Sequence, residues 1–162
     1  MGTLITAFVF AGVMSAYIFL GRALIREGNM EILESRTRTT LYQFTQDVST
    51  AAGVSPTGMT SSSLVLYEPS SVSEVTYTYN SANGQLTRTP PGSATQTVML
   101  TGLVSFAFGY FDSYGILTSN PNAVKQINIT YTSSAGSAIT GSIANFNVVS
   151  PRVILKNKPY LQ

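Results

Sequence analysis

The side chains that could carry out chemistry are few in this chain and lie far apart in the sequence. It has no cysteine and no histidine, so no disulfide, cysteine–histidine zinc site or serine–histidine–aspartate triad can form. Its seven acidic residues include no evident pair placed for acid–base catalysis, and no glycine-rich phosphate-binding motif is present. We therefore expect that the protein is not an enzyme and that it uses no metal ion or organic cofactor.

The densest group of charges lies between residues 22 and 38. Glutamates at 27, 31 and 34 would stand on adjacent turns of a helix, where like charges repel one another. Either this is a solvated face, or arginines of neighbouring copies supply the missing partners in a crowded assembly. We favour the second interpretation, which makes seven residues candidates for charge pairs between subunits: Arg22, Arg26, Glu27, Glu31, Glu34, Arg36 and Arg38.

The overall charge also points to an assembly or a membrane. Only 10% of residues are charged, against about a quarter in an average globular domain. The nine basic residues are scattered and form no stripe interleaved with aromatic residues, so we expect no nucleic-acid partner. A chain with so few surface charges is expected to hide part of its surface.

The first half of the chain predicts one long helix over residues 1–52 with two kinds of surface. Residues 3–20 contain no charge, and eighteen residues at about 1.5 Å each span roughly 27 Å, close to the hydrocarbon thickness of a bilayer. This part is expected to anchor the protein in a membrane and to form the core of a filament after assembly. The residues expected to pack in that core are Leu4, Ile5, Phe8, Val9, Phe10, Gly12, Val13, Tyr17 and Leu20.

The second part of this helix is amphipathic. Its apolar residues recur at helical spacing and predict one face that packs on a sheet. The residues of that face are Met30, Leu33, Leu41, Phe44 and Val48.

After Gly53, Pro56 and Gly58 the apolar period becomes two, which predicts short strands. Asn83-Gly84 is a typical hairpin turn, and residues 133–141 read as a loop. The alternation of Phe106, Phe108 and Tyr110 favours plain core packing over a sugar-binding or base-binding surface. The strands are expected at residues 64–67, 74–79, 85–88, 96–100, 104–111, 125–132, 142–149 and 152–155.

These elements together predict an α+β fold. Its long N-terminal helix, apolar and then amphipathic, would pack on one antiparallel sheet formed by a β domain at residues 53–162.

The order of these elements resembles that of type IV pilins and type II secretion pseudopilins. The stretch SAYIFLGRALIREGNMEILESRTRTTLYQFTQDVSTA is similar to the helix of PilW-like and J-type pseudopilin-like proteins, with Arg38, Phe44 and Asp47 at the matching places. Later, VSFAFGYFDSYG and VKQINITYT are similar to paired strands of the same group. The resemblance implies the pilin fold.

The resemblance also implies a life cycle. The subunit would wait in the inner membrane, where assembly machinery extracts it into a helical filament of many copies on the cell surface. Ile5 stands where the family has a glutamate. We therefore expect that this glutamate, and a basic leader cut by the prepilin peptidase, lie upstream of Met1.

Three functions remain open from the sequence. The first is the bulk structural subunit of a type IV pilus-like filament. The second is a minor pilin or pseudopilin that primes or tips a pilus or a type II secretion pseudopilus. The third is a membrane-tethered β module that binds through its Ser/Thr-rich loops.

Overall fold

The computed structural model describes residues 2–67, 74–136 and 143–158, without the side chains of residues 2–12, 25–30, 135–136 and 143–144. The chain begins with α1 (Gly2–Thr50), whose side chains are thus described in two segments, 13–24 and 31–50. A short β1 (Gly53–Val54) and a 3₁₀ turn, η1 (Pro56–Gly58), follow. The remaining strands are β2 (Ser63–Tyr67), β3 (Glu74–Asn80), β4 (Gln85–Thr89), β5 (Thr97–Leu100), β6 (Leu103–Phe111), β7 (Gln126–Gly136), β8 (Ile143–Val149) and β9 (Val153–Ile154).

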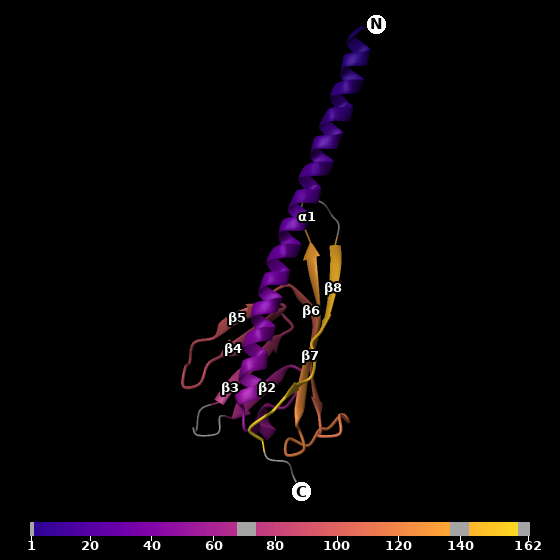
Figure 1. The fold of residues 1–162 in the computed structure, drawn as a ribbon. Coiled ribbons are helices and arrows are strands. Elements are labelled where there is room, and N and C mark those ends of the chain that lie inside the picture. The colour runs from indigo at the N-terminus through magenta and orange to yellow at the C-terminus, as the bar shows by residue number, and fades with distance from the viewer. Residues whose placement is uncertain (1, 68–73, 137–142, 159–162) are drawn as a thin grey trace.

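These strands form two antiparallel sheets (Figure 1). The first has the order β1-β2-β3-β4-β5, and the second has the order β6-β7-β8, with β9 also paired to β7. Within each sheet a strand therefore pairs with its neighbour in sequence, except that β9 returns to β7. The meander follows from the short turns, and Asn83-Gly84 closes the β3–β4 hairpin with Gly84 at a φ of 60°.

The predicted fold class is wrong, because it placed one long helix on a single sheet. The strands divide between β5 and β6, where Gly102 adopts a φ of 72° and turns the chain. The backbone N–H of Leu103 donates to the carbonyl of Gly84 at 3.0 Å, and from there β6 pairs with β7 in the second sheet. The described part of α1 lies against both sheets, in contact with β5, β7 and β9.

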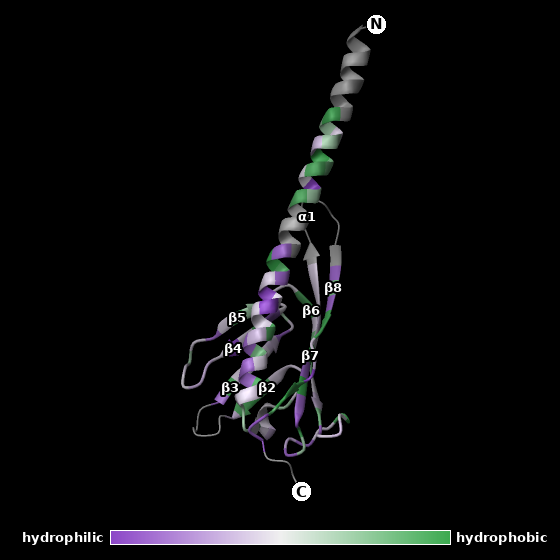
Figure 2. Ribbon diagram, viewed as in Figure 1, coloured by the Kyte–Doolittle hydropathy of each residue, from purple (hydrophilic) through white to green (hydrophobic). Residues whose placement is uncertain are grey.

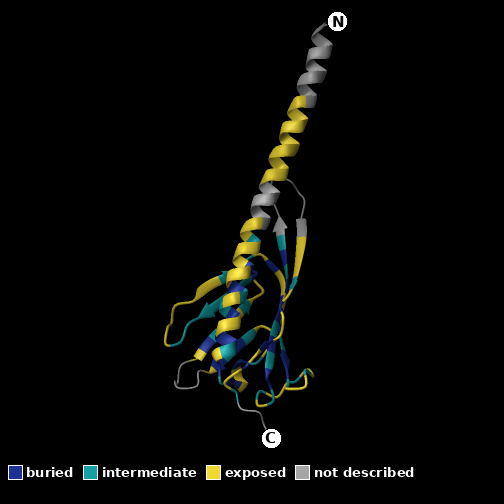
Figure 3. Ribbon diagram, viewed as in Figure 1, coloured by how far each residue is buried: buried dark blue, intermediate teal, exposed yellow. Residues whose placement is uncertain are grey.

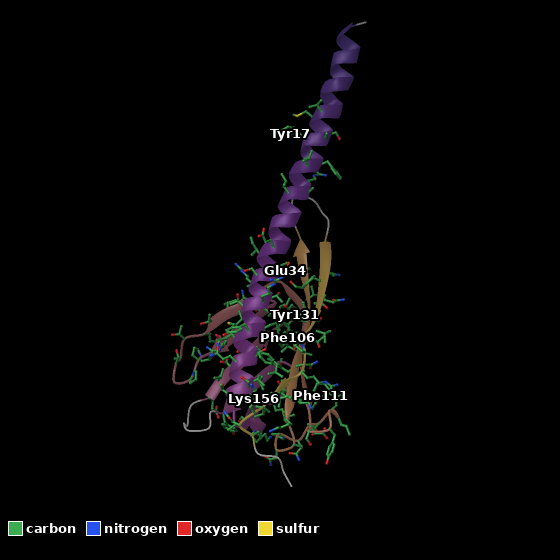
Figure 4. The ribbon with its side chains drawn as sticks, in the orientation of Figure 1. Tyr17, Glu34, Phe106, Phe111, Tyr131 and Lys156 are labelled. Atoms are coloured by element: carbon green, nitrogen blue, oxygen red, sulfur yellow. The ribbon has the colours of Figure 1, made fainter. Side chains whose placement is uncertain are left out.

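One apolar core joins the helix to both sheets. Phe44 of α1 makes an edge-to-face contact with Tyr77 of β3, with ring centroids 5.7 Å apart, and stacks at 6.4 Å on Phe108 of β6. Phe106 packs against Phe108 and stacks on Tyr131 of β7 (Figure 4). The prediction that the alternating aromatic residues of β6 belong to the core is therefore confirmed.

The helix face that packs on the sheets agrees in part with the predicted one. Phe44 and Val48 are fully buried, Leu41 packs against the core and Leu33 is half-buried. The side chain of Met30 lies outside the described residues.

The strands lie within a few residues of their predicted positions, but the predicted loop at residues 133–141 is partly wrong. β7 continues to Gly136, where it still pairs with Ile143 of β8. Residues 137–142 lie outside the described part. The pattern failed here because small and polar residues in a sheet carry no apolar alternation.

Candidate functional site: the helix and its attachment

The first described segment of α1, residues 13–24, displays apolar side chains to solvent (Figures 2 and 3). Every described large apolar side chain in it is more than half exposed, from 52% to 78%. Val13, Tyr17, Leu20 and Leu24 follow one another at steps of four, three and four residues and so share one face of the helix. The other apolar side chains lie to either side of that face. These side chains are Val13, Met14, Tyr17, Ile18, Phe19, Leu20 and Leu24.

The predicted filament-core residues lie in or before this segment. Val13, Tyr17 and Leu20 are exposed and contact no part of the apolar core. Tyr17 lies on the part of α1 that projects beyond the sheets (Figure 4). The side chains of Leu4, Ile5, Phe8, Val9 and Phe10, and the surroundings of Gly12, are not described. Within the described part of the chain, no helix is both long enough and apolar enough to cross a membrane.

The predicted inter-subunit charges fall into three groups. Arg38 donates to Glu34 of the same helix at 2.7 Å, and Arg36 reaches the hydroxyl of Thr101 at 3.5 Å, so these charges have partners within the chain. Arg22 and Glu31 are exposed, and neither has an ion pair among the described residues. The side chains of Arg26 and Glu27 are not described.

A buried ion pair attaches α1 to the first sheet. Asp47 is 9% exposed and accepts two hydrogen bonds from Arg88 of β4, at 2.6 and 3.0 Å. The hydroxyl of Tyr77 donates to the same carboxylate at 2.6 Å, and the amide of Gln43 donates at 3.0 Å. We call these four residues the anchor cluster. The carboxylate is thereby fully hydrogen-bonded, as a buried charge requires.

The anchor cluster raises the pKa values of Tyr77 and Arg88. Burial, and then the charge of Asp47, raises the pKa of the Tyr77 hydroxyl well above its usual value. The hydrogen bond to Asp47 raises the pKa of Arg88. Tyr77 and Arg88 lie opposite each other in the β3–β4 ladder, so the hairpin itself brings the two donors together. All the donors of the cluster bond to the carboxylate of Asp47 on α1, and two of the donor residues lie on the first sheet. The cluster therefore attaches the helix to that sheet.

Two threonines attach α1 at further points. The hydroxyl of Thr37 is hydrogen-bonded to that of Tyr131 on β7 at 2.8 Å. The hydroxyl of Thr40 donates to the carbonyl of Met99 on β5 at 3.2 Å. Both threonines are buried, so α1 is fixed to both sheets by polar as well as apolar contacts.

Sequence reasoning missed most of this attachment. Thr37 and Thr40 are polar and were not part of the apolar stripe, and Arg88 was not considered a site residue. One signal was present: Arg88 follows Leu86 by two residues and so shares its inward face. An arginine on a buried strand face requires an acidic partner, and Asp47 lies beside Val48 on the buried helix face.

No protein-family model matches this chain, and no curated protein is similar to it in sequence.

Proposed function

We propose that this protein is the structural subunit of an extracellular filament of type IV pilus type and that it polymerises through the first half of α1. The observation that carries the proposal is the exposed apolar segment at residues 13–24. The sequence resemblance of the helix to those of pilins and pseudopilins agrees with this function.

The free energy to be gained by burying the exposed apolar side chains of this segment indicates that a partner covers it. Burying one large apolar side chain away from water is worth about 1.5–3 kcal/mol. For the seven side chains of this segment, which are already partly covered, the sum is on the order of 10 kcal/mol. That equals the whole stability of a typical domain. The segment is therefore not expected to remain in water as a monomer.

Other copies of the chain are the partner we favour after extraction from the membrane. A helix with apolar side chains around most of its circumference can touch several neighbours at once. The attachment of α1 to both sheets fixes the orientation of its second half, so equivalent contacts can be repeated from copy to copy. A repeated contact that does not close on itself produces an open helical polymer.

Electron microscopy of material sheared from producing cells tests the proposal. Thin fibres labelled along their whole length by an antibody to residues 53–162 are the expected result. Label at fibre ends, or none on fibres made of another protein, would instead indicate a minor pilin or pseudopilin. No fibres, with release only by detergent, would indicate the tethered module.

Two matched substitutions sharpen the test. Val13→Glu places a charge in the exposed helix segment, where the side chain is 56% exposed, and should abolish fibres. Val104→Glu changes a similarly exposed valine of β6, at 63%, and should leave them intact. Normal fibres from the Val13 variant would contradict assembly through this segment.

A further inference from the structure

A second exposed apolar surface lies in the connection between β6 and β7. It contains Tyr114, which is 87% exposed, Ile116 at 63% and Leu117 at 72%. We call these three residues, together with the adjacent Arg152, the distal patch. The β6–β7 connection lies at the end of the molecule opposite to the N-terminus of α1 (Figure 1).

The backbone that carries this patch is held in one conformation. One carboxylate oxygen of Asp112 accepts the N–H groups of both Tyr114 and Ile116 at 2.9 Å. The N–H of Asp112 in turn donates to the carbonyl of Ile116 at 2.9 Å. Gly115 completes the turn with a φ of 78°, which a residue with a side chain rarely adopts.

Arg152 fixes the loop from outside. Its guanidinium donates to the carbonyl of Gly115 at 3.1 Å and lies 3.8 Å from the centre of the Phe111 ring. Phe111 also forms a β-bridge with Leu117. The apolar side chains are therefore presented by an ordered backbone, which lowers the entropy lost when a partner binds.

The composition of the patch is that of a protein-binding surface. Tyrosine and arginine are enriched at the energetic centres of protein interfaces, and adjacent exposed apolar side chains mark such surfaces. Nothing in the packing of the domain requires three large apolar residues here, because all three are exposed rather than part of the core.

The chain itself supplies a complementary surface. The exposed segment 13–24 of α1 is apolar around most of its circumference, apart from Ser15 and Arg22, so one face can bind a patch while others contact neighbouring helices. One pair of opposite charges lies near the two surfaces, although the segment itself contains the exposed cation Arg22. Glu31, which follows that segment, has no ion pair among the described residues, and Arg152 has no acidic partner in the same part of the chain. The two surfaces lie at opposite ends of one molecule and cannot meet within it (Figure 1).

We propose that the distal patch binds the exposed helix segment of a second copy of this chain. The inference rests on the proposed filament function and assigns to that filament a contact between its β domain and a neighbouring helix. Because the contact joins two different surfaces, it repeats from head to tail without closing. Tyr114, Ile116 and Leu117 supply the apolar contact, and Arg152 supplies a charge opposite in sign to that of Glu31.

Cysteine cross-linking in assembled fibres tests this contact on a background that contains no native cysteine. A chain carrying both Leu20→Cys and Leu117→Cys should form a ladder of covalent oligomers on mild oxidation. Either substitution alone should give dimers at most, because a chain with a single thiol can form only one disulfide bond. Leu20→Cys combined with Val104→Cys is the matched control and should give no ladder. Replacing Leu20→Cys by Tyr17→Cys in the same pair with Leu117→Cys tests the adjacent turn of the helix for the same contact.

A charge in the patch provides the second measurement. Leu117→Glu alters a side chain that is 72% exposed and should leave the fold intact. It should reduce the yield of sheared fibres by about ten-fold or more.

The outcomes separate this inference from the proposed function. Normal fibres without a ladder, together with normal fibre yield from Leu117→Glu, would overturn the patch contact and leave the filament function standing. A ladder from detergent-dispersed monomers would also overturn it, because the cross-link would not then report assembly. Normal fibres that lose adhesion in the Leu117 variant would assign the patch to an outside target. A wild-type chain that forms no fibres would overturn the proposed function itself.

Discussion

The anchor cluster allows a quantitative prediction. Replacing Asp47 by asparagine keeps the shape of the side chain and removes its charge. Arg88 then loses the carboxylate that it contacts at 2.6 and 3.0 Å, and Tyr77 loses a charged acceptor at 2.6 Å. The free energy of unfolding should therefore fall.

The expected size of the loss follows from the exposure of the pair. Removing one member of a fully buried ion pair costs about 3–5 kcal/mol. The side chain of Arg88 is 15% exposed, so water can hydrate part of the guanidinium after the change. The amide oxygen of the introduced asparagine can still accept one hydrogen bond, which lowers the cost further. We expect a loss of about 2–3 kcal/mol.

Urea unfolding of the full chain in detergent micelles measures this loss. Tyrosine fluorescence is the signal, since the chain has no tryptophan, and linear extrapolation gives the free energy in water. Arg38→Gln is the control, because it removes the Arg38–Glu34 pair, whose side chains are 78% and 59% exposed. That pair should be worth less than about 0.5 kcal/mol. If the Asp47→Asn variant lost no more than this control, the anchor cluster would not stabilise the attachment of α1.

Two further predictions concern the turns and the tyrosines. Gly84→Ala should lower the free energy of unfolding by about 1–3 kcal/mol in the same urea assay. The residue has a φ of 60°, and its new methyl group would lie 2.6 Å from the carbonyl oxygen of Leu103. Gly92→Ala is the control that isolates backbone strain, because Gly92 has a φ of 68° with no atom near its added methyl group. Burial raises the pKa of three tyrosine side chains: Tyr77, Tyr110 and Tyr131. Their contribution to stability is complete below pH 10.0, the ordinary tyrosine pKa, and is lost as the pH rises further, because the unfolded chain releases these protons before the folded chain does. Above pH 10.0, each of these three tyrosines should lower the free energy of unfolding by up to about 1.4 kcal/mol per pH unit. In an alkaline titration, tyrosinate absorbance that reaches its full value while the protein is still folded would contradict this.

The sequence predicted the positions of the strands better than their assembly. Alternation shows which side chains of a strand are buried, and Asn83-Gly84 shows where one hairpin turns. Neither shows which strands share a sheet. The division falls at Gly102, whose positive φ cannot be read from its identity.

The candidate site shows the same limit. The apolar character of most of segment 13–24 is visible in the sequence because residues 3–20 form a run without charges. The anchor cluster is not, because Asp47 and Arg88 are 41 residues apart and neither is apolar. The distal patch was also missed, since exposed apolar residues in a loop form no periodic pattern and only the structure shows that Tyr114, Ile116 and Leu117 face solvent.

The attachment of α1 at separate points has a mechanical consequence. Thr37 is bonded to the second sheet and Asp47 to the first, about 15 Å apart along the helix axis. A pull on α1 along its axis would load both connections at the same time, so the force would be shared between the two sheets. Neither sheet would have to bear the full tension alone. The helix could slide out only after the polar connections and the shared aromatic core had both yielded.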